Sequence, residues 1–155
     1  MDKDSTSNIM LLQDTTELSD LSSSLGFAKT LFLGKDLVLV ESKSKKELLD
    51  AIARAKQQRK LTIYKPPTEE LLRFALEKTA VDVVYGLENI HPKDSMHYIR
   101  GGLDQVLCTI AAQRGKTIGF SFSEILHAVE KGPLLARMMF NIALCKKYKV
   151  KIMFS

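Results

Sequence analysis

Residues 97–123, HYIRGGLDQVLCTIAAQRGKTIGFSFS, carry the pattern that decides the fold class. The stretch predicts a loop, a helix that opens at Gly101 and Gly102 and stops at Gly115, and a strand over 117–122. Large and small side chains alternate along that strand, which is typical of a strand with one buried face. A helix that leads through a single glycine into a buried strand is half of a βαβ unit, so the stretch predicts a parallel sheet.

The predicted helix has one apolar face. Its apolar residues recur at intervals of three and four, and the polar residues lie off that face. We expect this face to pack on another element. It consists of Leu103, Val106, Leu107, Ile110 and Ala111.

The rest of the chain repeats the alternation of strand and helix with short connections. Strand patterns cover 30–33, 37–41, 61–64, 81–85 and 150–154, and helix patterns cover 15–25, 44–58, a segment capped by Thr68, 123–129 and 133–148. The two strand patterns on either side of Gly34 fit a hairpin or two successive sheet strands. The alternation predicts an α/β protein with a mainly parallel sheet, built as a barrel, a barrel fragment or an open doubly wound sheet. The sequence has neither a GxGxxG nor a GxxxxGK[ST] loop, which removes the main reason to expect a nucleotide-binding open sheet.

Length and composition fit one domain. The chain has 155 residues, of which 45% are hydrophobic, enough for a single core. We expect residues 1–7 to be a flexible N-terminus and residues 8–155 to form a single domain. No apolar run approaches the ~18 residues that read as a membrane span, and the start lacks the order of a signal peptide, so we expect a cytoplasmic protein.

The net charge of +5 is unevenly distributed. Acidic residues dominate 1–20, whereas lysine and arginine dominate 43–65 and recur over 114–151. Basic surface that is concentrated in segments favours a polyanionic partner. On charge alone, a solvated lysine-rich surface is an equal alternative.

Residues for protein-based catalysis are not grouped in the sequence. His91, His97 and His127 have no partner at metal-binding spacing, and no serine lies in a nucleophile elbow, so we expect neither a metal site nor a catalytic nucleophile. Cys108 and Cys145 both lie on apolar helical faces and are far apart in sequence. We expect two buried structural thiols, without a second thiol near either one.

Basic side chains near the strand-to-helix junctions are the candidates for ligand binding. Arg100 follows Tyr98 at such a junction, and Arg137 shares a helix face with Asn141 and Tyr148. Guanidinium and ammonium groups beside an amide and an aromatic ring can hold phosphates and a base or sugar. The predicted nucleic-acid-binding residues are Arg100, Lys116, His97, Arg137, Lys146, Lys151 and Lys65.

Several segments resemble one known family. The segments are VDVV at 81–84, YIRGGLDQVL at 98–107, IGFSF at 118–122, and LLARM at 134–138 followed by Asn141 and CKKY at 145–148. In these segments, which follow one another in the same order, the chain resembles the archaeal ribonuclease P protein component 3 family, relatives of the eukaryotic thirty-kilodalton subunit. The resemblance extends from about residue 37 to the end.

The resemblance implies a TIM-like (β/α) barrel, with or without its last elements, because family members usually continue past the strand at 150–154. It also implies a noncatalytic subunit of ribonuclease P, the endoribonuclease that removes the 5′ leader of precursor tRNA. The implied partners are the ribonuclease P RNA, precursor tRNA and other protein subunits, one of which pairs directly with this chain. The family binds no cofactor of its own, since magnesium acts with the catalytic RNA.

Two other functions are compatible with a barrel of this type. The first alternative is a metal-dependent phosphoesterase of the related barrel superfamily, which the absence of ligand spacing disfavours. The second is a small-molecule-binding barrel whose basic surface only keeps it solvated.

Overall fold

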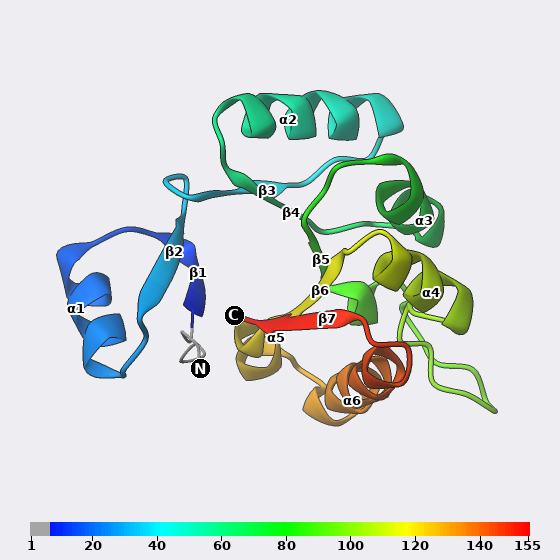
Figure 1. Ribbon diagram of the computed structural model, residues 1–155. Helices are drawn as coiled ribbons and strands as arrows, with labels where there is room; N and C mark the ends of the chain where they lie inside the picture. The colour runs from blue at the N-terminus through cyan, green and yellow to red at the C-terminus, as the bar shows by residue number, and fades with distance from the viewer. Residues whose placement is uncertain (1–6) are drawn as a thin grey trace.

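The computed structural model describes residues 7–155. Their strands form one seven-stranded sheet in which neighbours in sequence are neighbours in space, and every pair is parallel (Figure 1). The strands are β1 (Ser7–Gln13), β2 (Lys29–Leu33), β3 (Leu37–Val40), β4 (Leu61–Tyr64), β5 (Val83–Tyr85), β6 (Thr117–Phe120) and β7 (Lys151–Phe154). The parallel α/β arrangement agrees with the prediction from the strand and helix alternation.

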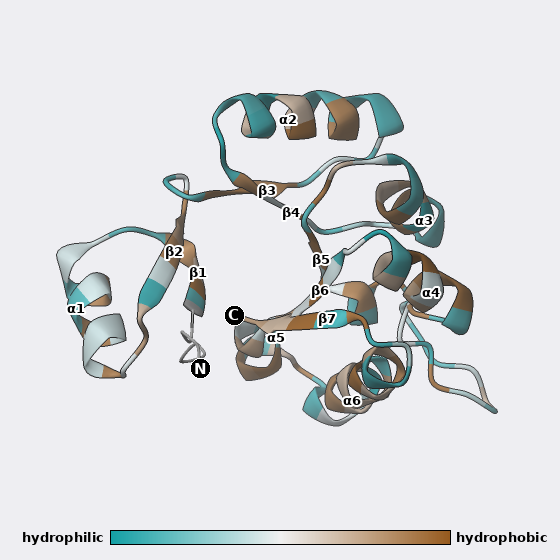
Figure 2. Cartoon of the chain, in the orientation of Figure 1, coloured by the Kyte–Doolittle hydropathy of each residue, from teal (hydrophilic) through white to brown (hydrophobic). Residues whose placement is uncertain are grey.

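The sheet is curled, and its connecting helices lie outside the curve (Figure 1). The helices are α1 (Thr16–Ser24), α2 (Lys45–Gln57), α3 (Glu69–Lys78), a short 3₁₀ helix η1 (Leu87–Asn89), α4 (Gln105–Gln113), α5 (Phe122–His127) and α6 (Lys131–Lys147). Hydrophobic residues dominate most strands, whereas the outer helices mix hydrophobic and hydrophilic residues (Figure 2).

The prediction of a TIM-like barrel is wrong. A TIM barrel closes by pairing the first of eight strands with the last, whereas in residues 7–155 the sheet has seven strands and β1 does not pair with β7. Over the described residues the structure is an open, curled half-barrel in which β1 and β7 are the two edge strands. The alternation of strand and helix is encoded locally and occurs in open and closed sheets alike, so it could not decide closure. The predicted flexible N-terminus lies outside the described residues, except for Ser7, where β1 begins.

The chain passes from β2 to β3 without a helix. These strands meet in parallel at a single pair, Leu33 with Leu37, so neither a hairpin nor a regular crossover forms. The Gly34 N–H donates to the Leu37 carbonyl at 2.9 Å, and Gly34 has a φ of +81°, which favours glycine. The Asp36 carboxylate accepts the Phe32 N–H at 3.0 Å and fixes the turn.

The decisive stretch 97–123 folds with shifted boundaries. The helix begins at Gln105 rather than at the glycines, because Asp104 caps it by accepting the Leu107 N–H at 2.7 Å. The strand ends at Phe120, and Phe122 is the first residue of α5, with 57% of its surface exposed.

Side chains on both faces of the sheet form the core. The larger cluster lies between the sheet and the helices, and a smaller one on the other face is formed by Ile9, Leu37, Ile63, Val83 and Tyr85. On α4 the buried residues are Leu107, Cys108 and Ala111, whereas Val106, which we expected on the packed face, is 48% exposed.

Cys108 and Cys145 are close together, contrary to the expectation that neither thiol has a second thiol near it. Both are free and fully buried, on α4 and α6 respectively. A hydrogen bond with Cys108, together with burial, raises the pKa of the Cys145 thiol. The sequence separation of the two cysteines concealed this contact, because only helix packing brings α4 and α6 together.

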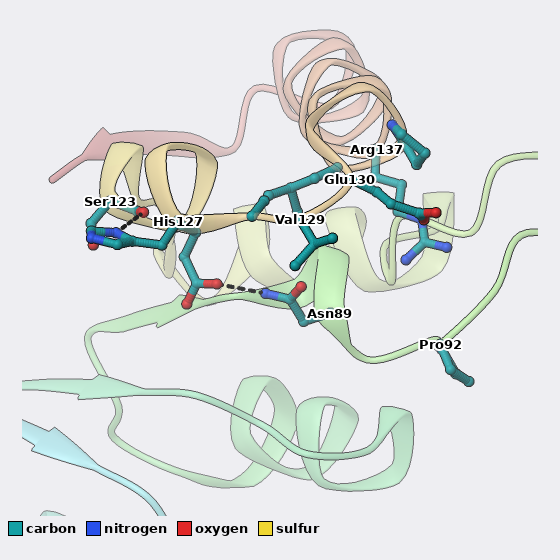
Figure 3. A pocket seen from close by; sticks show the side chains of 11 residues that line it. Asn89, Pro92, Ser123, His127, Val129, Glu130 and Arg137 are labelled. Atoms are coloured by element: carbon teal, nitrogen blue, oxygen red, sulfur yellow. Dashed lines mark hydrogen bonds between the residues drawn. The ribbon is translucent and has the colours of Figure 1, made fainter.

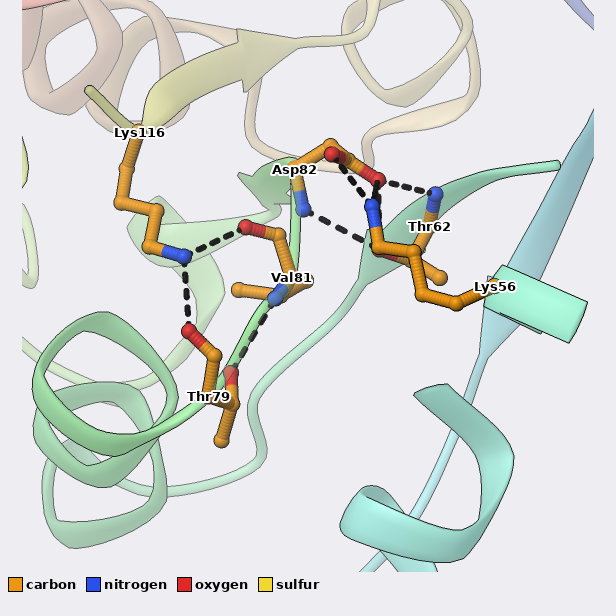
Figure 4. Close-up of polar contacts among 6 residues, drawn as sticks. All are labelled: Lys56, Thr62, Thr79, Val81, Asp82 and Lys116. Carbon is orange, nitrogen blue, oxygen red and sulfur yellow. Dashed lines mark hydrogen bonds and ion pairs between the residues drawn. The ribbon is translucent and has the colours of Figure 1, made fainter. Parts of the chain in front are cut away.

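A polar network ties β4 to the start of β5 (Figure 4). The Asp82 carboxylate accepts the Thr62 N–H at 2.8 Å and the Thr62 hydroxyl at 2.7 Å, and it pairs with Lys56 at 2.7 Å. Burial alone would raise the pKa of Asp82, but the hydrogen bonds from Lys56 and Thr62 hold it below its ordinary value.

This network predicts a pH-dependent contribution to stability. Asp82→Asn should lower the free energy of unfolding by about 1–3 kcal/mol at pH 7, because hydrogen bonds to a charged group are lost. Since the folded-state pKa of Asp82 is depressed, its contribution is present above the unfolded value of about 3.9 and disappears as the pH falls through the folded value. Urea unfolding at pH 7 and near pH 3 measures it, with the exposed Asp20→Asn on α1 as control. A wild-type advantage that stays constant down to pH 3 would contradict the assignment.

Candidate nucleic-acid interface

The seven basic residues predicted to bind nucleic acid do not form one surface. Lys65 follows β4, and His97 and Arg100 lie on the loop after η1, at the carboxyl end of the parallel strands. Lys116 and Lys151 lie at the opposite end, directly before β6 and at the start of β7. Arg137 and Lys146 lie on α6, where Arg137 is buried and Lys146 is exposed.

Lys116 is bound to backbone carbonyls. Its Nζ donates to the Thr79 carbonyl at 2.7 Å and to the Val81 carbonyl at 2.8 Å (Figure 4). Burial lowers the pKa of this ammonium. With 9% of the residue exposed, the structure favours a role for Lys116 in fixing the connection between α3 and β5.

Arg137 and Asn141 also turn inward. The Arg137 guanidinium donates to the carbonyls of Glu88 at 3.0 Å and His91 at 2.8 Å, and its Nε pairs with Asp94 at 2.8 Å. The Asn141 amide donates to the Gly101 carbonyl at 2.6 Å. The face of α6 that we expected to hold a phosphate therefore holds the loop that follows η1.

Two cavities at the carboxyl end of the strands have carboxylates in their walls, and the smaller one also contains the exposed Lys43. One, of about 430 Å³, has Lys65 in its wall, and Lys65 pairs with Glu124 at 2.6 Å. The other, of about 510 Å³, lies between η1 and the α5–α6 region and contains Asn89, which donates to Glu124 at 3.1 Å (Figure 3). In residues 7–155, no three His, Cys, Asp or Glu side chains are placed to hold a metal ion.

Glu88 lies near this end of the sheet and is fully buried. Neither of its carboxylate oxygens has a hydrogen-bond partner within the described structure. Burial raises the pKa of Glu88 to about 7, with a smaller contribution from Glu124.

A third cavity combines cations with exposed aromatic rings, and we call it the tyrosine groove. It has a volume of about 590 Å³ and lies between the loop after η1 and the end of α6. Its lining residues are Glu69, His91, Tyr98, Ile99, Arg100, Gly101, Gly102, Leu103, Asp104, Gln105, Phe140, Leu144, Lys147 and Tyr148.

Each wall of the tyrosine groove carries one tyrosine ring with a cation over it. The Arg100 Cζ lies 5.8 Å from the centre of the Tyr98 ring, and the Lys147 Nζ lies 5.6 Å from the centre of the Tyr148 ring. The Tyr148 hydroxyl donates to the Gln105 side-chain carbonyl at 3.3 Å, which joins the end of α6 to the start of α4. Hydrogen bonding to Arg100 lowers the pKa of Tyr98.

The sequence predicted only part of the tyrosine groove. It predicted Arg100 as a binding residue and placed Tyr98 and Tyr148 beside candidate binding residues, but it did not predict Lys147 or Gln105. The only signal for Lys147 was its place beside Lys146 in the CKKY segment, from which Lys146 alone was chosen. Both missed residues belong to the groove because the loop after η1 folds back onto α6.

The fold defines an α/β protein whose sheet, over the described residues, is open and all-parallel, and comparison with solved structures finds a similar fold. One chain of a structure described as "cryo-EM structure of archaeal Ribonuclease P with mature tRNA" has the same fold, with a TM-score of 0.64 and 17% sequence identity. The match covers 97% of the present chain, which spans 64% of the length of that chain. Neither a scan of protein-family models nor a search of curated proteins gave a match.

Because Glu88 is buried, we expect the free energy of unfolding to fall as the pH rises. Because its folded-state pKa is raised from 4.5 to about 7, the folded state retains a proton that the unfolded state has lost, and stability declines by about 1.4 kcal/mol per pH unit between those values. Glu88→Gln should therefore be more stable than the wild type at pH 8, with an advantage that shrinks toward pH 5. Thermal and urea unfolding measure this, with Glu17→Gln as control. A stability advantage of Glu88→Gln that is equal at pH 5 and pH 8 would contradict the raised pKa of Glu88.

Substitutions of Lys116 and Lys146 should have opposite effects on stability and on RNA binding. Lys116→Met should lower stability by about 1–3 kcal/mol, because two backbone carbonyls lose their donor, and should leave the RNA affinity of the folded protein unchanged. Lys146→Met, on exposed helix surface, should change stability by no more than about 0.5 kcal/mol. Because the sequence predicts that Lys146 binds nucleic acid, the same variant should weaken RNA binding. Urea unfolding and RNA-binding titrations separate the two effects. A stable Lys116→Met protein with weakened RNA binding would restore Lys116 to the interface.

Proposed function

We propose that this chain is a protein component of a ribonuclease P-type ribonucleoprotein that removes the 5′ leader of precursor tRNA. The observation that carries the proposal is the shared fold, over 97% of the chain, with a chain of archaeal ribonuclease P bound to mature tRNA. The sequence resemblance to the archaeal protein component 3 family supports the same assignment, and we propose that subunit as the specific identity.

The surface chemistry suits a noncatalytic role in such a particle. The tyrosine groove offers cations and aromatic rings, and phosphate contacts provide affinity without sequence readout. The described residues present no three-residue metal site. In this proposal the catalytic RNA and its magnesium perform the cleavage, and the protein helps to fold or position the RNA.

We propose that a second protein subunit binds to an apolar surface at the end of the sheet. Phe122 and Phe154 stack there with ring centres 5.5 Å apart, and the exposed Leu135 and Met139 of α6 line the same hollow. β7 pairs only with β6 among the described strands, so its other edge offers unpaired backbone groups. An extended apolar segment of a neighbouring subunit would satisfy both features.

None of the helices in the described part of the chain is long and apolar enough to span a membrane. We propose that the protein works where precursor tRNA is processed, in the cytoplasm.

Precursor-tRNA cleavage by the reconstituted catalytic RNA and other protein subunits, at limiting magnesium, tests the function. Adding this chain should raise the cleavage rate or lower the magnesium requirement, because its basic surface replaces part of the counterion screening that the RNA needs. An unrelated protein of similar size and net charge controls for nonspecific charge effects. If the folded chain has no effect on an otherwise active particle, the proposal fails, and phosphoesterase assays with added divalent metals become the next measurement.

A further inference from the structure

The tyrosine groove contains two cations that are not neutralised by carboxylates. In residues 7–155 neither Arg100 nor Lys147 forms an ion pair, and each lies over a tyrosine ring instead. The two acidic residues of the groove have other partners, since Glu69 pairs with His91, which also lines the groove, at 2.6 Å, and Asp104 caps α4. Two positive charges therefore remain available to an anionic ligand.

The loop wall of the groove is held rigidly. The Asp94 carboxylate accepts the Arg100 N–H at 2.8 Å and also pairs with the buried Arg137. Asn141 lies so close beneath Gly101 that a Cβ at this position would overlap the amide oxygen. A wall fixed in this way costs little conformational entropy when a ligand binds.

The aromatic rings indicate a planar ligand with free ring faces. Tyr98 is 59% exposed, and Arg100 occupies the space over one face of its ring. A base inside a duplex has both faces covered by its neighbours, whereas an unpaired base can stack on tyrosine or on a guanidinium plane. The cavity of about 590 Å³ falls within the ~300–1,000 Å³ typical of small-ligand sites.

We infer that the tyrosine groove binds an unpaired nucleotide of the RNA partner, with the base stacked on Tyr98 or Tyr148 and a phosphate beside Arg100 or Lys147. The inference rests on the proposed RNA-binding function and narrows it to single-stranded or bulged RNA. Gln105, at the start of α4 beside Tyr148, is placed to contact a base edge.

Fluorescence anisotropy with the full chain tests the inference. The probes are a labelled single-stranded RNA of ten nucleotides and a duplex of the same length, at one fixed salt concentration. Tyr98→Ala and Tyr148→Ala should each weaken single-strand binding about 5- to 100-fold, which is the range for loss of one stacked base, and leave duplex binding unchanged. Tyr98→Phe and Tyr148→Phe retain the ring and should bind nearly as the wild type does.

Charge variants provide a second measurement. Arg100→Gln or Lys147→Gln should each reduce by about one the slope of log affinity against log salt, because one phosphate contact is lost. Lys131→Gln, which removes an exposed charge of α6 outside the groove, is the matched control and should leave the slope unchanged. Thermal melting shows that each variant is folded, and Tyr98→Ala is the decisive one because its side chain is largely exposed.

The possible outcomes distinguish failure of the inference about the tyrosine groove from failure of the proposed ribonuclease P function. If single strands and duplexes bind alike and the tyrosine variants bind as the wild type does, the inference is wrong, even if the chain stimulates precursor-tRNA cleavage. If the tyrosines govern single-strand binding but the chain has no effect on cleavage, the groove is an RNA site and the ribonuclease P assignment is wrong. Binding of an apolar peptide in the groove in preference to RNA would also overturn the inference.

Discussion

Two polar side chains buried on α6 hold the loop after η1 in place. Arg137 reaches the carbonyls at 88 and 91 and the Asp94 carboxylate, and Asn141 reaches the carbonyl at 101. Removal of either partner from a buried charged contact is costly, so these bonds fix the loop after η1 far more firmly than its exposed side chains could. The tyrosine groove exists because this loop is fixed against α6.

The open sheet leaves two edge strands. A closed barrel would have no edges, whereas here β1 and β7 are both edges among the described strands. Exposed apolar side chains on α5, α6 and β7 gather beside the second edge. An edge of this kind offers unpaired backbone groups, which is why we propose a neighbouring subunit as its cover.

Basic residues serve two opposite purposes in this chain. Lys116 and Arg137 bind backbone carbonyls inside the structure, whereas Arg100 and Lys147 face a groove. A carbonyl oxygen and a phosphate oxygen accept the same donors with similar geometry. Residue type therefore could not distinguish an internal support from a cation that is free to meet a phosphate, and our sequence-based set contains both.

The sequence by itself determined the local structure, because hydrophobic periodicity, helix caps and turn glycines act over a few residues. It predicted the helices capped by Ser44 and Thr68 and the strands at 61–64 and 150–154, and these are present with small boundary shifts. Only the tertiary structure decided that the sheet stays open, that Cys108 meets Cys145, and that Lys147 joins Tyr98 and Arg100 around one cavity. These features depend on contacts between segments 37 or more residues apart, and such contacts are set by how the helices pack on the curled sheet rather than by any local pattern.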